Sequence, residues 1–127
     1  MRYSLDEYHD LIESGELDET PRTELLEGWL VQKPSSSPPH SVATNLVSRL
    51  LEDVKLIDMF VDLHAPITLS TSEPEPDLSL IRGTIRDYSS RHPYSADVVL
   101  VVEVADSSLK RDLTWKKRVY ASAGIAQ

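Results

Sequence analysis

The stretch DVVLVVEV, residues 97–104, decides the fold class of this chain of 127 residues. It is a continuous apolar run, and a strand that is apolar on both faces is typical of a central strand covered on both sides. Glu103 is the only charged residue within positions 98–104. We therefore predict a sheet with layers on both faces and this strand at its centre.

The segments before this strand alternate between helical and extended patterns. Residues 4–13 predict a short helix with Ser4 as its cap and Glu7 completing a capping box. Residues 23–33 predict a strand in which Gly28 marks a turn or a bulge. The proline-rich connection PSSSPPH at 34–40 predicts irregular structure. Apolar residues then recur at helical spacing, as Val42, Leu46 and Leu50 or as Val47, Leu51 and Val54, and predict a core helix over 41–57.

Further strands and a last helix complete the expected order α-β-α-β-β-β-α. A helix capped by Asp106, Ser107 or Ser108 should run to about residue 123 and end at Gly124. The other expected segments are strands over 59–64, 66–70 and 77–81 and an irregular stretch over 82–96. We predict one α/β domain over residues 1–127, with a mixed central β-sheet flanked by helices.

The composition excludes several classes of protein. Hydrophobic residues make up 40% and charged residues 27%, as in a globular domain. The chain has no cysteine, which excludes disulfides and thiolate metal sites. We found neither a signal peptide nor an apolar run of membrane-spanning length, so a cytoplasmic location with no membrane partner is expected. The net charge of −8 argues against a protein that simply coats nucleic acid.

Two charged residues stand in apolar surroundings. Glu103 interrupts the apolar strand, where a carboxylate is costly unless it is paired or binds a cation. Lys116 lies in the middle of an apolar stripe of the last helix, formed by Leu109, Leu113, Tyr120 and Ala123 within about 40° of one line. For Glu103 the structural alternatives are a strand-end carboxylate that reaches water or a buried structural ion pair. For Lys116 the alternative is a stem that extends to solvent.

Asp77 completes a candidate site. It opens a predicted strand directly after Glu-Pro-Glu-Pro, where an acidic turn residue is the structural alternative. Two carboxylates on neighbouring strands and an inward lysine on the next helix would together form a site for a cation and a water. Oxygen ligands without cysteine favour Mg²⁺ or Mn²⁺ over zinc.

Several short motifs resemble one known family, the Uma-type "putative restriction endonuclease" domain of the PD-(D/E)XK superfamily. The resemblance runs from about residue 3 to the end of the chain. The motifs are Glu24-Leu-Leu-Glu27-Gly28, Ser37-Pro-Pro-His40, Glu75-Pro76-Asp77-Leu78, Val101-Val-Glu103-Val104-Ala-Asp-Ser107 and Asp112-xxx-Lys116-xxx-Tyr120-Ala-x-Ala-Gly124-Ile125. The resemblance implies a restriction-endonuclease-like core and metal-dependent hydrolysis of phosphodiester bonds, with DNA as the expected substrate.

The resemblance also implies roles for individual residues. Asp77 and Glu103 match the two acids of the motif and would hold the cation. The motif's lysine would follow two positions after the second acid, where this chain has an alanine, and Lys116 matches the helix lysine that replaces it in Uma-type proteins. An upstream glutamate would be Glu24, which we favour, or Glu27, because neighbouring residues of a strand point to opposite faces. His40 matches a histidine of the family pattern and is a further candidate.

Relatives in this family continue after Ala-Gly-Ile with another apolar strand, so we expect a domain truncated at its C-terminus, lacking one or more strands. An open sheet edge invites pairing with another chain, which predicts a homodimer. Two alternatives to an active nuclease remain open. One is a catalytically silent scaffold that keeps the fold, and the other is a nucleic-acid-binding or regulatory module without turnover.

Overall fold

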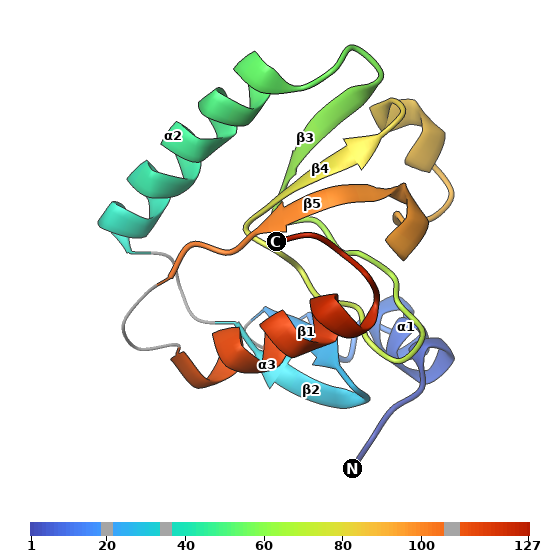
Figure 1. Ribbon diagram of the computed structural model, residues 1–127. Helices are drawn as coiled ribbons and strands as arrows, with labels where there is room; N and C mark the ends of the chain where they lie inside the picture. Colours follow the sequence, from blue (N-terminus) through green and yellow to red (C-terminus); the bar gives the residue numbers. More distant parts are fainter. Residues whose placement is uncertain (19–21, 34–36, 106–109) are drawn as a thin grey trace.

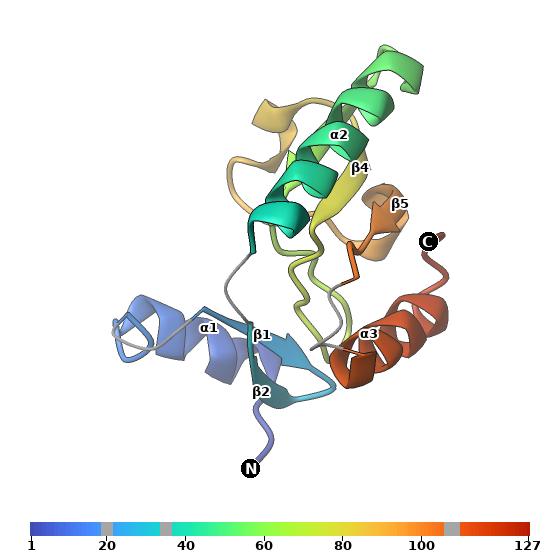
Figure 2. The same ribbon diagram turned by 90° about the vertical axis from the view of Figure 1, so that its left-hand side faces the viewer.

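The computed structural model describes residues 1–18, 22–33, 37–105 and 110–127, with only the backbone for 110–112. This part of the chain contains three α-helices and two antiparallel sheets, which confirms the predicted α/β class. In Figures 1 and 2 a three-stranded sheet and helix α2 form the upper part, and a β-hairpin with helices α1 and α3 forms the lower part. None of the described helices is long and apolar enough to cross a membrane.

Helix α1, Leu5–Glu13, begins with the predicted capping box. The backbone N–H of Glu7 donates to Ser4 Oγ over 3.1 Å, and the backbone N–H of Ser4 donates to Glu7 Oε1 over 2.9 Å. This exchange satisfies donors that the first turn of a helix leaves free. Tyr8 is the buried residue that anchors the helix to the rest of the fold.

Strands β1, Thr23–Leu26, and β2, Trp29–Gln32, form a hairpin in place of one long strand. Gly28 therefore marks a turn, which was one of the two predicted alternatives. Its φ of 87° lies in the left-handed region that side chains disfavour. The turn is tied to the N-terminal segment, because Tyr3 N donates to Gly28 O over 2.7 Å.

We predict that Gly28→Ala destabilises the fold by about 1–2 kcal/mol, more than Gly124→Ala does. Both glycines have a positive φ, but a Cβ at Gly28 would lie 3.2 Å from Arg2 Cβ, whereas a Cβ at Gly124 would meet nothing within 4 Å. Urea unfolding measures the free energy of unfolding of both variants. The loss in Gly124→Ala reports on backbone strain alone, and the additional loss in Gly28→Ala reports on the close contact. Equal losses of stability would show that the contact with Arg2 does not matter.

Helix α2, Pro38–Val54, differs from the prediction in where it begins and in which of its residues are exposed. It begins at Pro38, inside the stretch predicted to be irregular, because proline fits the first turn of a helix and Ser37 caps it. The expected core helix also exposes most of its apolar residues. Val42, Leu46, Leu50 and Val54 are exposed, whereas Val47 and Leu51 are only half-buried.

The three-stranded sheet has the order β3-β4-β5, with strands Met59–Leu63, Leu78–Arg82 and Val98–Val102. The central strand is thus β4, and the prediction that 97–104 forms the central strand is wrong. The first four residues of β4 are buried, whereas β5 has half-buried positions. The outer edge of β5 meets only the chain end among the described residues, where Val101 N donates to Ala126 O over 2.9 Å.

The segment 66–70, predicted as a strand, forms only an isolated bridge between Thr68 and Tyr94. Its role is to fill the core with Ile67. The irregular stretch after β4 contains two short 3-10 turns, Ile85–Tyr88 and Ser95–Asp97. The main core cluster consists of Ile67, Ile81, Val98, Val101, Tyr120 and Ile125.

Helix α3, Lys110–Ser122, supports the core from the C-terminal side. It ends before Gly124, which has a φ of 74°, as expected for a residue just beyond a helix end. The predicted cap at 106–108 lies outside the described residues. Tyr120 lies on the inner face of α3 and belongs to the core cluster.

Candidate active site

Asp77 and Glu103 meet because of the register of β4 and β5. Leu78 pairs with Val102, so the next residues outward, Asp77 and Glu103, face each other across the sheet end. The backbone N–H of Asp77 donates to Glu103 Oε1 over 3.0 Å. The backbone N–H of Val104 donates to Asp77 Oδ2 over 2.7 Å. Each carboxylate is thus fixed by a main-chain donor of the opposite strand.

Lys116 of α3 brings the positive charge to this pair. Its side chain is buried, and Nζ lies 2.5 Å from Glu103 Oε2 and 2.9 Å from Glu24 Oε1. Nζ also donates to the carbonyl oxygen of Glu75 over 3.3 Å. An ammonium group has three donors, so these three acceptors satisfy it completely. The lysine points inward, as its place in the apolar stripe predicted, and does not extend to solvent.

The structure places Glu24 at this site and Glu27 away from it. Glu24 lies within β1, is 4% exposed, and its Oε1 also accepts the backbone N–H of Glu75 over 3.0 Å. Glu27 lies in the hairpin turn with a φ of 50°. Its half-exposed carboxylate accepts hydrogen bonds from Trp115 and Arg118. Of these two glutamates, only Glu24 contacts Lys116.

The charges of this cluster influence one another strongly. Burial alone would lower the pKa of Lys116, but Glu103 and Glu24 outweigh burial and hold its pKa above the usual value. Burial raises the pKa of Glu103, and the contact with Lys116 opposes that rise. Burial, and then Glu103, raise the pKa of Tyr120 well above its usual value. Tyr120 therefore stays protonated and donates to Glu103 Oε2 over 2.9 Å.

Two histidines flank the carboxylate of Asp77. His40, on the first turn of α2, has Nε2 at 3.3 Å from Asp77 Oδ2. His64, just after β3, has Nδ1 at 3.7 Å from Asp77 Oδ1. Burial, followed by the nearby Lys33, lowers the pKa of His64. His64 also has a φ of 52°, and backbone conformations of this kind cluster at functional sites.

Basic residues gather around Glu75 beside the cluster. Lys33 of the segment after β2 donates to the carbonyl oxygen of Glu75 over 2.9 Å. The exposed Arg22 forms an ion pair with Glu75 Oε1 over 2.6 Å. These cations lie next to the carboxylates and could contact a phosphate group that approaches them.

The donor set suits a hard divalent cation, although the side chains do not form a complete cage. Lys116 contacts the carboxylates of Glu24 and Glu103, and Asp77 lies next to Glu103, so the carboxylates outnumber the ammonium group in this part of the site. Within the described residues, no three His, Asp or Glu side chains are arranged so that they could hold one cation. Mg²⁺ commonly needs only one or two protein carboxylates, with water and phosphate oxygens as its other ligands.

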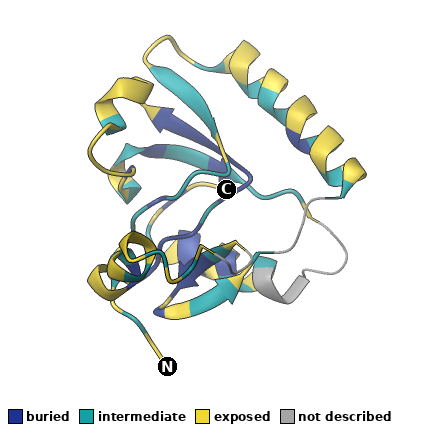
Figure 3. Ribbon diagram, turned by 180° about the vertical axis from the view of Figure 1, so that it is seen from behind, coloured by how far each residue is buried: buried dark blue, intermediate teal, exposed yellow. Residues whose placement is uncertain are grey.

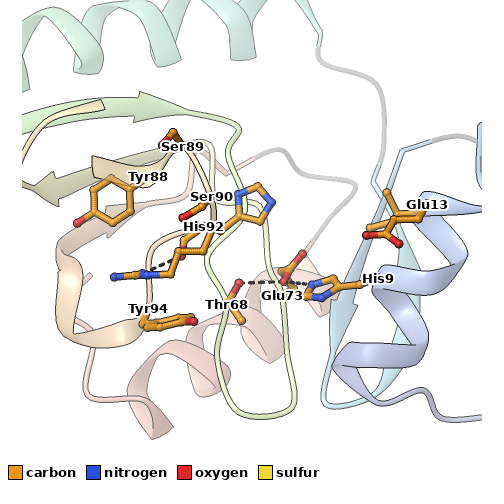
Figure 4. A pocket seen from close by; sticks show the side chains of 11 residues that line it. His9, Glu13, Thr68, Glu73, Tyr88, Ser89, Ser90, His92 and Tyr94 are labelled. Atoms are coloured by element: carbon orange, nitrogen blue, oxygen red, sulfur yellow. Dashed lines mark hydrogen bonds and ion pairs between the residues drawn. The ribbon is translucent and has the colours of Figure 1, made fainter. Parts of the chain in front are cut away.

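A separate cavity of about 510 Å³ lies where α1 meets the loops of the sheet (Figure 4). Glu73, 2% exposed, accepts hydrogen bonds there from His9 Nε2 over 2.6 Å and from Thr68 Oγ1 over 2.9 Å. None of the residues of the Lys116 cluster lines this cavity. These contacts connect α1 to the loop 66–76. They give the buried carboxylate of Glu73 a structural role.

Four residues of the site were not singled out by sequence reasoning: Lys33, His64, Glu75 and Tyr120. Tyr120 carried a usable signal, because it shares the apolar stripe of Lys116 and has a hydroxyl group that needs a partner when buried. His64 and Lys33 carried none: His64 is a single histidine between Leu63 and Ala65, and Lys33 stands beside the polar connection that starts at Pro34. Glu75 contacts Lys116 through its backbone carbonyl oxygen. Every residue has this atom, so the sequence gives no indication of the contact.

Comparisons with known proteins identify a family and a similar fold. The sequence model of the family described as "Uma2: Putative restriction endonuclease" matches residues 5–127. The fold is similar to the crystal structure of "a putative nuclease belonging to DUF820" from Anabaena variabilis, with a TM-score of 0.70 and 19% sequence identity. That match covers 98% of this chain and 70% of the Anabaena chain. No curated protein matches the chain.

Proposed function

The chain belongs to the family described as "Putative restriction endonuclease", and from this premise we propose that it is a metal-dependent endonuclease that hydrolyses phosphodiester bonds of DNA. The catalytic residues in this proposal are Asp77, Glu103, Lys116 and Glu24. One observation carries it: the buried Lys116 lies between the buried carboxylate of Glu24 and the half-buried carboxylate of Glu103, which in turn accepts the backbone N–H of Asp77. A hollow of about 290 Å³ beside β5 and α3 reaches Glu103.

Asp77 and Glu103 would hold a divalent cation, with Mg²⁺ or Mn²⁺ as the expected ion. When bound, such a cation polarises a phosphoryl oxygen and makes a water molecule more acidic. The main-chain donors of Val104 and Asp77 hold the two carboxylates in place before any ligand arrives. Positioning of this kind is the main contribution that a protein makes to phosphate chemistry.

Lys116 would act as a donor and not as a base. Its raised pKa keeps it protonated at neutral pH. It can therefore offset the negative charge that develops on the phosphate, and it would orient the attacking water if the longest of its three contacts, to the carbonyl oxygen of Glu75, were exchanged for that water. Glu24 and Glu103 position Lys116, and Tyr120 restricts Glu103 through its hydroxyl group.

We expect Mg²⁺ or Mn²⁺ to raise the melting temperature of the protein. A ligand that binds only the folded state stabilises it by about 2.7 kcal/mol at a concentration of 100 Kd. Differential scanning fluorimetry across a concentration series of each cation measures the shift. The shift should disappear in Asp77→Asn and persist in Glu27→Gln, whose carboxylate lies away from the site. An equal shift in both variants would place the cation elsewhere.

A catalytically silent scaffold is the second candidate function. The observation that favours it is the complete satisfaction of Lys116, because a buried ion network with every donor paired can serve stability alone. Assays on duplex DNA, single-stranded DNA and RNA with Mg²⁺ or Mn²⁺ separate the two functions. Absence of cleavage on all three substrates would favour the scaffold.

A homodimer is also part of the proposal. Two copies would carry two sites, which suits cutting both strands of a duplex, and closed two-fold dimers are the commonest assemblies.

A further inference from the structure

Helix α2 carries a row of exposed apolar side chains along its outer side, which we call the outer ridge: Val42, Leu46, Leu50 and Val54. Their exposed fractions are 59%, 62%, 61% and 65%. Figure 3 shows that most of α2 is exposed, and in Figure 1 α2 forms an outer edge of the molecule. The row continues beyond the helix into Leu56 and Ile57, which are 63% and 99% exposed.

The outer ridge faces away from the sheet. Thr44, the buried residue of α2, marks the side that contacts the sheet, and Val42 and Leu46 lie about 160° around the helix from it. His40, on the inner side, reaches Asp77. The side of α2 that carries the ridge therefore serves neither the core nor the candidate active site.

The exposed area is larger than a monomer usually leaves open. Six large aliphatic side chains at these exposures present roughly 600 Å² of apolar surface, the upper limit for the largest patch of ordinary monomers, and patches of this size mark interfaces. Two such patches against each other would bury about 1,200 Å², the lower limit of specific protein–protein interfaces. The area therefore fits a second copy held with moderate affinity.

We propose that a second copy of this chain packs on the outer ridge, so that two α2 helices cross in an antiparallel, two-fold dimer. Residues spaced by four form a straight ridge, and two identical ridges of this kind interlock at a crossing angle of about −50°. A two-fold axis makes the patch its own partner. This inference names the surface of the homodimer proposed above and does not depend on nuclease activity.

The charges beside the ridge favour the antiparallel arrangement. Arg49 and Asp53 are exposed and lie one turn apart on the same flank. An antiparallel copy reverses their order, so that Arg49 of one copy meets Asp53 of the other. In a parallel two-fold pair this flank would instead face the opposite flank of the partner helix, and the pairing of Arg49 with Asp53 would be lost.

Light scattering coupled to size exclusion, over micromolar to submillimolar protein concentrations, tests the surface. The wild-type mass should rise toward twice 14.3 kDa with concentration. The double variant Leu46→Glu, Leu50→Glu should remain at 14.3 kDa, with unchanged circular dichroism. Ile12→Glu, an exposed aliphatic residue on α1, is the matched control and should dimerise like the wild type. A monomeric wild type, or a dimer that persists in the double variant, would overturn the proposal.

A charge swap tests the orientation with substitutions that spare the apolar side chains. Arg49→Asp and Asp53→Arg should each weaken the dimer about tenfold or more, and the two changes together should restore it. Failure of the double swap to restore association would rule out the antiparallel arrangement. DNA cleavage by the monomeric Leu46→Glu, Leu50→Glu variant is measured separately. Because dimer formation and cleavage are measured separately, the failure of this inference can be distinguished from the failure of the proposed nuclease activity.

Discussion

The proposed cleavage of DNA is expected to fall by about 10²–10³-fold or more when Asp77, Glu103 or Lys116 is replaced by alanine, because each change removes a group that we propose holds the cation or acts on the transition state. Isosteric variants, Asp77→Asn and Glu103→Gln, should lose activity to a similar degree, since they keep the side-chain shape but remove the charge. Rates of plasmid nicking in Mg²⁺ and in Mn²⁺ measure the loss.

The two glutamates of the β1–β2 hairpin supply a matched control for this experiment. Glu24 contacts Lys116, whereas Glu27 lies in the turn and contacts Arg118. Glu24→Gln should therefore lower the cleavage rate strongly, and Glu27→Gln should leave it close to the wild-type rate. Similar rates for both variants would mean that the upstream glutamate plays no part in the reaction.

The catalytic losses should not add. Residues that act as one unit fail together, so a double variant should be only slightly slower than the slower single variant. Multiplicative losses would indicate that Asp77 and Lys116 act independently. Cleavage that survives in all three alanine variants would assign the activity to another site or another protein.

The second large effect concerns stability. Lys116→Met is expected to destabilise the fold by about 3–5 kcal/mol, because it leaves the buried carboxylate of Glu24 and the half-buried carboxylate of Glu103 without their cation. Urea unfolding followed by circular dichroism measures the change. The methionine keeps most of the volume of the lysine stem, so the loss reports on charge more than on packing.

A triple variant separates the structural role of the cluster from its chemistry. Replacing the carboxylates as well, in Glu24→Gln, Glu103→Gln, Lys116→Met, removes every unpaired charge and should recover most of the lost stability. The same protein should remain inactive. If Lys116→Met alone is as stable as the wild type, water must reach the carboxylates, and the cluster does not behave as a buried network.

Elements that depend on neighbouring residues were predictable from the sequence by itself. The capping box of α1, the turn at Gly28 and the end of α3 before Gly124 all follow from hydrogen bonds and backbone preferences within a few positions. The inward direction of Lys116 was also predictable, because helical periodicity places a residue on a face regardless of the partner it meets. Glu103 was identified as unusual because a charge within an apolar strand is costly, whereas Asp77 was singled out by its place at the start of a predicted strand.

Only the tertiary structure decided which strand is central, which side of α2 is covered and which glutamate reaches Lys116. An apolar run such as 97–104 shows that a strand is buried, but the pairing of β3, β4 and β5 depends on the path of the chain between them. Periodicity shows where the apolar stripes of α2 lie and not what covers them, so the outer ridge could not be distinguished from a core face. Glu24 lies 92 positions before Lys116, and their contact is set by how the hairpin and α3 pack together, a global property that no local pattern records.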